Sequence, residues 1–225
     1  MAEGAREVAI VDCGLGNLFS VARACEHAGL RPRITSDREV VERAPALILP
    51  GVGAFGDAMA RLRDLDLIGS LRDFVAAGKP FLGVCLGLQL LMSESDEFGS
   101  HRGLGLIPGR VKRLSGAGPV KVPHVGWSAV RRPADVAPEA WRRSPLAGVP
   151  EGASMYFVHS YHAEPDDTAV VLSRSTHGET DYVSGIARGA VFAFQFHPEK
   201  SGADGLRIYA NFSSYVQNGV FGHER

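Results

Sequence analysis

One cysteine of this sequence lies in surroundings that suit a nucleophile. Residues 81–89 read Phe-Leu-Gly-Val-Cys-Leu-Gly-Leu-Gln, an apolar run that enters Gly-x-Cys-x-Gly. This is the pattern of a nucleophile elbow with Cys85 in place of serine, because the glycines permit a tight strand-to-helix turn. A helix N-terminus there would favour a thiolate, and the N–H of Leu86 would point toward an oxyanion. The alternative is that Cys85 only packs, as we expect for Cys13 and Cys25.

A thiolate needs a general base, and the base needs a group that orients it. Among eight histidines, His197 directly follows a strand-like run, and Glu199 lies two residues later. Pro198 would stiffen this turn, so both side chains can point the same way. We interpret the pair as a base with its orienting carboxylate. The alternative is a loop histidine in a surface salt bridge with Glu199.

Two glycine-rich turns follow strand-like runs. Pro50-Gly51-Val52-Gly53 offers backbone N–H groups that can line an oxyanion hole or bind an anion, although such a turn is often only a turn. Gly14-Leu15-Gly16 lacks the third glycine of a dinucleotide fingerprint, so we predict no Rossmann cofactor site.

The first half of the chain alternates apolar strands with helices, which would position these residues. We expect strands over 7–12, 31–35, 46–49 and 81–84. We expect helices from 17 to 29, over 37–43, from 53 to 77 with a break near Asp66, and after Cys85 through Leu88, Leu91 and Met92. This alternation predicts a mostly parallel α/β sheet covered by helices on both faces.

The second half has a different texture, with short β-like pieces over 103–131 and a Pro- and Ala-rich loop or surface excursion over 134–152. Further strands are expected over 155–158, 169–172, 182–187 and 191–194, and a closing helix over 202–217. We find no repeat or linker, so residues 1–225 are predicted to form a single α/β domain with a mixed second half.

Composition argues against several other classes. The chain of 225 residues balances 24 Lys and Arg against 25 Asp and Glu, which gives no electrostatic footprint for nucleic acid or an anionic membrane. No apolar run approaches the roughly 20 residues of a membrane helix, and residues 1–7 are unlike a signal peptide. Three cysteines are too few for a disulfide framework, so we expect reduced thiols and a cytoplasmic protein.

The segments 83–89 and 197–199 together resemble the signature of the class I glutamine amidotransferases, and the resemblance runs along nearly the whole chain. It implies a flavodoxin-like fold and a Cys-His-Glu triad that hydrolyses the side-chain amide of glutamine through a γ-glutamyl thioester. Cys85 would attack, His197 would carry the proton to the leaving ammonia, and Glu199 would orient His197. No metal and no cofactor is implied.

The same resemblance implies further site residues. Val52, Gly53 and Leu86 match the oxyanion-hole positions of the family. Residues that match or accompany its glutamine-binding positions are Gly51, Gln89, Glu97, Ser160 and Tyr161. Cys13 departs from the family, which usually has an aromatic residue there, and this concerns local packing rather than the triad.

Five segments narrow the resemblance to family members that pass ammonia to a (β/α)8-barrel cyclase subunit in histidine biosynthesis. These segments are 12–21, 50–53, 121–127, 156–161 and 197–201. His124, Trp127 and Lys200 would then face the cyclase. Without the resemblance, Trp127 would be taken as a core aromatic residue and Lys200 as a solvated loop charge.

Two other functions stay open. A stand-alone cysteine hydrolase or peptidase on a related α/β fold would use the same elbow. A binding or regulatory domain could keep the fold without catalysis. Gln89 and the second-half segments argue against the first, and the intact Cys85, His197 and Glu199 argue against the second.

Overall fold

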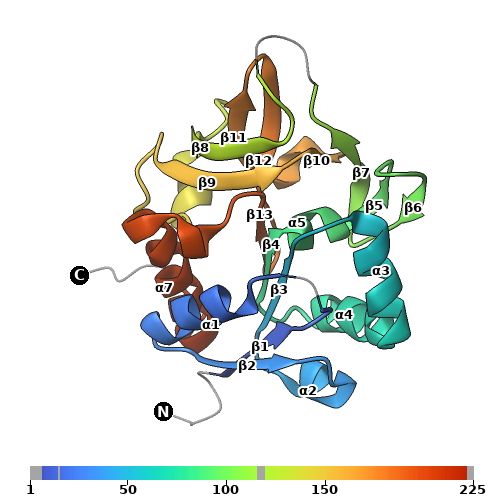
Figure 1. Cartoon of the computed structure of the whole chain (residues 1–225). Coiled ribbons are helices and arrows are strands. Elements are labelled where there is room, and N and C mark those ends of the chain that lie inside the picture. The colour runs from blue at the N-terminus through green and yellow to red at the C-terminus, as the bar shows by residue number, and fades with distance from the viewer. Residues whose placement is uncertain (1–6, 15, 116–119, 222–225) are drawn as a thin grey trace.

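A seven-stranded mixed sheet forms the centre of the molecule (Figure 1). The computed structural model describes residues 7–14, 16–115 and 120–221, so the expectations for residues 1–6 and for Leu15 lie outside it. In sheet order the strands are β11 (Val171–His177), β12 (Thr180–Arg188), β13 (Val191–Phe194), β4 (Phe81–Cys85), β3 (Leu47–Gly51), β1 (Glu7–Val11) and β2 (Arg31–Thr35). Strands from β13 to β2 pair in parallel, whereas β11, β12 and β13 pair antiparallel. The predicted mostly parallel sheet with a mixed second half is confirmed.

Helices cover both faces of this sheet, as the sequence predicted. They are α1 (Leu18–His27), α2 (Arg38–Arg43), α3 (Phe55–Asp64), α4 (Leu67–Ala76), α5 (Leu86–Leu90), α6 (Pro138–Arg142) and α7 (Gly202–Asn218). Val8 and Ile10 of β1 pack in the core under α1 and α7, while Ala9 and Val11 pack in the core under α3 and α4. Because alternate residues of one strand enter two cores, the strand reads as a continuous apolar run.

Two helices begin at side chains that cap their first turn. The side chain of Asn17 accepts from the backbone N–H of Ser20 at 3.2 Å and starts α1. Asp37 caps α2 by accepting from the N–H of Glu39 at 2.8 Å. Asp66 adopts a left-handed φ of 53°, which separates α3 from α4. The predicted break near this residue is confirmed.

Three expected elements are wrong in detail. The helix after Cys85 ends at Leu90 instead of continuing through Met92, because the carbonyl of Leu90 accepts from the N–H of Leu104 at 2.8 Å. Residues 134–152 are not only a loop, since they contain α6. Its Trp141 is 7% exposed and donates from Nε1 to the carbonyl of Leu172 at 2.8 Å. The strand expected from residue 169 starts only at Val171, after the 3-10 helix η2 (Thr168–Val170).

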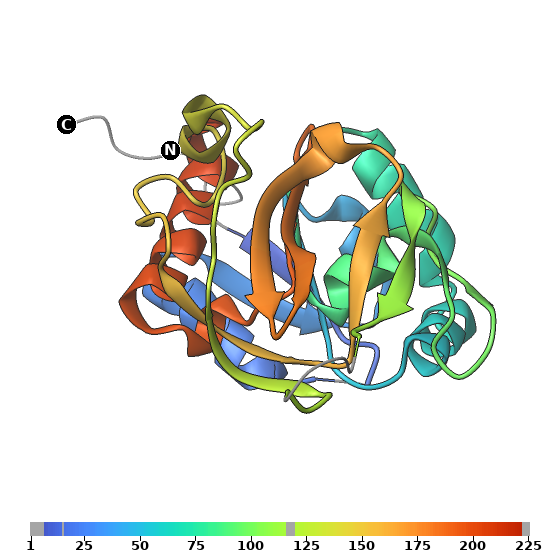
Figure 2. The ribbon, with the colours of Figure 1, turned by 90° about the horizontal axis from the view of Figure 1, so that it is seen from above.

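Two smaller sheets lie beside the main one (Figure 2). One contains β10 (Tyr161–Pro165), β7 (Ile107–Arg113), β5 (Met92–Ser95) and β6 (His101–Arg102), and the other pairs β8 (His124–Ala129) with β9 (Ser154–His159). In Figure 1, β9 crosses above the carboxyl ends of β4 and β13, where the candidate site lies. In the described part of the chain no helix is long and apolar enough to span a bilayer.

Candidate active site

Cys85 is the last residue of β4, and α5 begins at the next residue. Its backbone has φ 54° and ψ −107°, and the residue is 5% exposed. A non-glycine residue in such a conformation costs about 1–3 kcal/mol and persists only where the surroundings over-determine it. The strand, the strained turn and the short helix together form the geometry of a nucleophile elbow.

The two glycines around Cys85 are required by close packing. A Cβ on Gly87 would lie 1.8 Å from the carbonyl oxygen of Leu49, and a Cβ on Gly83 would lie 2.8 Å from the Cβ of Ala193. Real Cβ atoms essentially never approach other atoms this closely. The glycines therefore let α5 lie directly on β3, and let β4 pack beside β13.

His197 and Glu199 form a buried pair on the turn after β13. Nδ1 of His197 and Oε1 of Glu199 are 2.8 Å apart, and the two side chains are 4% and 2% exposed. The turn continues as the 3-10 helix η3 (Pro198–Lys200) into α7. The pair is buried, so the surface salt bridge considered for a lone His-x-Glu is not what the structure contains.

The environment of His197 favours its charged form. Burial alone would lower its pKa, but the interactions of the ring with Cys85 and Glu199 outweigh burial and raise the pKa to about 10. Nε2 of this ring is buried and forms no hydrogen bond of standard geometry among the described residues, although Cys85 is close enough to affect the pKa. Catalytic hydrogen bonds are often long before substrate binds, so Nε2 is available to exchange a proton with the thiol.

Ser201 links this turn to β9 through two hydrogen bonds. It was not predicted from the sequence to be a functional residue. Its hydroxyl donates to the carbonyl of His197 at 2.7 Å and accepts from the N–H of Tyr156 at 2.9 Å. The N–H of His197 donates in turn to the carbonyl of Tyr156 at 2.9 Å. The histidine backbone is thus tied to the strand that crosses above Cys85.

A cavity of about 270 Å³ opens beside the nucleophile. Its wall is formed by Val52, Gly53, Cys85, Leu86, Gln89, Glu97, Pro123, Val158, His159, Ser160 and Tyr161. All three residues proposed for the oxyanion hole and four of the five proposed for glutamine binding are therefore on one wall. Gly51 is opposite Cys85 in the β3–β4 register but does not line the cavity. Pro123, Val158 and His159 lie in the resembling segments 121–127 and 156–161, but they were not predicted to be site residues.

Glu97 lines the cavity and also accepts a hydrogen bond from the first residue of α3. Its Oε2 accepts from the N–H of Phe55, the first residue of α3, at 2.6 Å. Burial raises the pKa of this carboxyl, and the hydrogen bond from Phe55 acts in the opposite direction. Glu97 therefore connects the glycine-rich turn before α3 with the cavity wall.

Gln195 was not anticipated from the sequence. Its side chain has no exposed surface, and its Nε2 lies 3.6 Å from Sγ of Cys85. Its Oε1 accepts from Nε2 of Gln89 at 3.1 Å. Its spacing from His197 could have indicated its position. A residue two positions before His197 on an extended segment points to the same side as His197.

The residues expected to face a partner differ in exposure. Trp127 is 58% exposed, and Lys200 is exposed with its Nζ 5.7 Å from the ring centre of Tyr156. Trp127 and Tyr156 also contact each other, with ring centres 5.8 Å apart. The core-aromatic interpretation of Trp127 is therefore wrong.

His124 does not meet the expectation of a side chain that faces a partner. It is 4% exposed and stacks on His177 with ring centres 4.1 Å apart. Its Nδ1 is 3.2 Å from the hydroxyl of Tyr182. Burial, and then the neighbouring His177, lower its pKa to about 4. The ring is directed into the protein because these aromatic neighbours enclose it.

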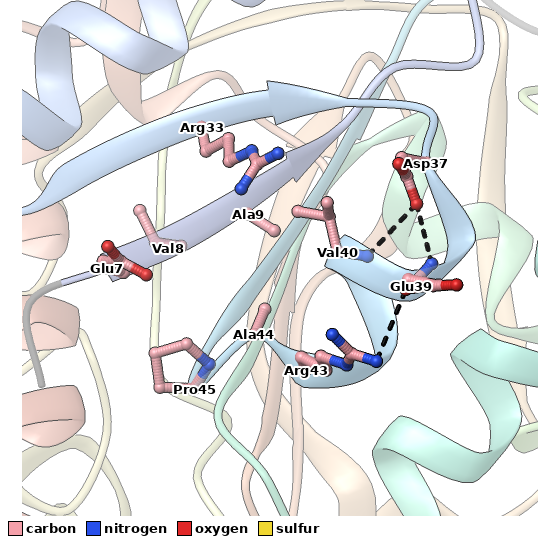
Figure 3. A pocket seen from close by; sticks show the side chains of 10 residues that line it. All are labelled: Glu7, Val8, Ala9, Arg33, Asp37, Glu39, Val40, Arg43, Ala44 and Pro45. Atoms are coloured by element: carbon pink, nitrogen blue, oxygen red, sulfur yellow. Dashed lines mark hydrogen bonds and ion pairs between the residues drawn. The ribbon is translucent and has the colours of Figure 1, made fainter. Parts of the chain in front are cut away.

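A second cavity, of about 310 Å³, lies between β1, β2 and α2 (Figure 3). Three of its charged side chains are engaged, since Asp37 caps α2 and Arg43 pairs with Glu39 at 3.4 Å. It contains no cysteine, serine or histidine. Among the described residues no cluster of His, Cys, Asp or Glu suits a metal ion. The chemistry is therefore concentrated around Cys85.

Comparison with known proteins agrees with this geometry. The family model described as class-I glutamine amidotransferase matches residues 9–214. The chain belongs to this family. Solved structures of similar fold include "Structure of PurLQS from Thermotoga maritima", with a TM-score of 0.71 and 18% identity over 93% of this chain and 98% of that one. Another, "Crystal structure of glutamine amidotransferase", has a TM-score of 0.70 and 19% identity over 93% and 98% of the two chains.

Relatives within the class I amidotransferases are much more similar in sequence. "Imidazole glycerol phosphate synthase subunit HisH" of Moorella thermoacetica is 45% identical over 97% of this chain and 100% of its own. The proteins of the same name from Aquifex aeolicus and Geobacillus kaustophilus are 46% and 47% identical, over 90% and 91% of this chain and 94% and 95% of theirs.

Proposed function

We propose that this protein is the glutaminase subunit of imidazole glycerol phosphate synthase. It hydrolyses glutamine to glutamate and ammonia, and passes the ammonia to a cyclase subunit that forms imidazole glycerol phosphate and aminoimidazole carboxamide ribonucleotide in histidine biosynthesis. The observation that carries this proposal is the 45–47% identity to relatives of that name along nearly the whole chain. Cys85 at the elbow beside a buried His-Glu pair supports the chemistry.

The proposed reaction proceeds through a thioester. The thiolate of Cys85 attacks the amide carbon of glutamine, and the developing oxyanion is held by backbone N–H groups among Val52, Gly53 and Leu86. His197 holds the thiol proton at Nε2 and delivers it to the departing ammonia, while Glu199 keeps Nδ1 in place. Water activated by His197 then cleaves the thioester, which releases glutamate and restores the thiol.

The cavity favours a free amino acid over a peptide. Its volume of about 270 Å³ is just below the range of roughly 300–1,000 Å³ that ligand sites usually have. Gln89 uses its Nε2 within the protein, on the carbonyl of Tyr161 at 2.8 Å and on Gln195. Its Oε1 is then the atom that can accept a hydrogen bond from a substrate N–H. This arrangement argues against the stand-alone peptidase considered above.

The proposed partner is a (β/α)8-barrel cyclase subunit, with which this chain forms a heterodimer in the cytoplasm. Exposed Trp127 contacts Tyr156, and such aromatic residues are enriched at protein interfaces. Lys200 places a cation beside the same tyrosine. Val125, on the same strand as Trp127, is also 58% exposed. In the described residues the three cysteines form no disulfide, which suits a reducing compartment.

A glutaminase assay tests the proposal. Purified chain should release ammonia from glutamine when combined with a cyclase subunit and its nucleotide ligand. Cys85→Ala should abolish the release while it still folds and still binds the partner. No ammonia from the wild-type pair, or preferential cleavage of simple esters or peptides, would reject the proposal. Retained activity in Cys85→Ala would reject Cys85 as the nucleophile.

A further inference from the structure

A chain of side-chain amides leads from the cavity wall to the sulfur of Cys85. It starts at the backbone carbonyl of Tyr161, which accepts from Nε2 of Gln89 at 2.8 Å. The same nitrogen donates to Oε1 of Gln195 at 3.1 Å. Nε2 of Gln195 then lies 3.6 Å from Sγ of Cys85. Gln89 is 5% exposed and Gln195 has no exposed surface, so little water can compete for these bonds.

The donor-to-acceptor direction of these hydrogen bonds is set by the backbone carbonyl of Tyr161. A backbone carbonyl can only accept, so Gln89 must present its NH2 group to Tyr161. That group has a second hydrogen, and the atom of Gln195 facing it must be an acceptor, which is Oε1. The NH2 group of Gln195 is then directed at Sγ. If the Gln195 amide were flipped, two NH2 groups would face each other and an oxygen would face the sulfur.

An N–H group directed at sulfur favours the charged form of a cysteine. A thiol is a weak acceptor, whereas a thiolate is an anion that gains from each donor aimed at it. Cys85 is 5% exposed, so the anion has little water around it to replace such a donor. Besides His197, Gln195 is the polar side chain that the described structure places on Sγ, because the other contact, 3.9 Å away, is the carbonyl of Val158.

The geometry points to Gln195 as a catalytic residue whose side-chain N–H stabilises the Cys85 thiolate, with Gln89 as the positioning residue that fixes the direction of that N–H. This inference rests on the proposed function only in taking Cys85 as the nucleophile. It also gives Gln89 two roles, since its Nε2 orients Gln195 while its Oε1 is left for the substrate.

The test measures the rate at which iodoacetamide alkylates Cys85 in the isolated chain between pH 5 and 10, followed by mass spectrometry of the Cys85 peptide. Gln195→Met keeps an unbranched side chain but removes the donor. Its alkylation midpoint should move up by about one pH unit, so that alkylation below the midpoint is about tenfold slower. Gln195→Glu keeps the outline of the amide but brings an acceptor, and should move the midpoint further in the same direction. Gln89→Leu frees Gln195 to turn, and should give a smaller upward shift.

Ser173→Ala is the matched control, because Ser173 is fully buried in the same sheet and its Oγ is 3.1 Å from that of Ser184. It should lose some stability but keep the wild-type midpoint. Folded Met and Glu variants of Gln195 that titrate like the wild type would overturn the inference. If the Met variant does not fold, the Glu variant decides. The assay needs neither glutamine nor cyclase. Shifted midpoints in the variants, together with no ammonia release by the wild-type chain and cyclase, would reject the proposed function and leave the role of Gln195 standing.

Discussion

Gly87→Ala tests whether packing beneath the elbow holds the nucleophile in place. The new Cβ would lie 1.8 Å from the carbonyl oxygen of Leu49, whereas contacts under 3.0 Å essentially do not occur. α5 must therefore move from β3 by about 1.2 Å, the difference between these two distances. Over-packing of this kind costs about 1–3 kcal/mol of the free energy of unfolding. For a chain of this size that is a fall of about 2–12 °C in Tm.

The same displacement should reduce catalysis, because α5 begins at Leu86, directly after Cys85. A misplacement of about 1 Å can cost about 100-fold in rate. We therefore expect kcat/KM for glutamine, measured in the complex with the cyclase, to fall about 100-fold while the variant still folds. Calorimetry gives the Tm, and coupled ammonia detection gives the rate.

Gly69→Ala is the matched control within a helix. Gly69 lies in α4, and a Cβ there would meet nothing within 4 Å. Alanine is about 0.5–1 kcal/mol more favourable than glycine in a helix interior, so this variant should gain stability and keep full activity. A Gly87→Ala protein with wild-type Tm and kcat/KM would refute the packing explanation of the elbow.

Three further predictions concern the triad and the exposed surface. Glu199→Gln weakens the 2.8 Å charge-assisted bond to His197, so kcat should fall about 10- to 100-fold with little change in KM, and an unchanged kcat would speak against an orienting role. Burial opposes the charge on His197, but Cys85 and Glu199 raise its pKa from 6.5 to about 10. The stabilisation that the charged ring gives the folded state is therefore complete below pH 6.5 and is lost as the pH rises through 10. Urea midpoints should therefore fall more between pH 7 and 10.5 in the wild type than in Cys85→Ala, and equal losses would contradict the coupling. Trp127→Ala and Lys200→Ala should weaken binding of the cyclase about tenfold in titration calorimetry without changing Tm, and unchanged binding would exclude this surface from the interface.

The sequence predicted the central sheet well because its signals there are local. Apolar runs such as 81–84 and 191–194 enter two cores, so every position is hydrophobic and the strand is visible without tertiary knowledge. Asn17 and Asp37 mark helix starts through bonds to N–H groups two or three residues away. The elbow was predictable for the same reason, since two glycines flank Cys85 within five residues.

The predictions from sequence are wrong where contacts between segments far apart in the chain determine the structure. The helix after Cys85 stops at Leu90 because the carbonyl there bonds to Leu104, which lies on another segment. Trp141 orders its own short helix because its indole reaches the carbonyl of Leu172. His124 is enclosed by aromatic residues from β9, β11 and β12, which local spacing does not reveal. Gln195 was missed for the same reason, because it is positioned by a hydrogen bond from Gln89, 106 residues earlier in the chain.

Packing around Gly83 and Gly87 holds the strained backbone of Cys85 in place, and chemistry explains why the strain is retained. A φ of 54° costs about 1–3 kcal/mol, and the two glycines beside it add backbone entropy that folding must overcome. An unstrained residue there would continue β4 with its ordinary alternation, and α5 would not begin at Leu86. The turn instead brings Sγ beside Val158 of β9 and Gln195 after β13, and within reach of His197. Two segments, β9 and the stretch that follows β13, thus converge on one sulfur, and that convergence is the gain for which the fold retains the strain.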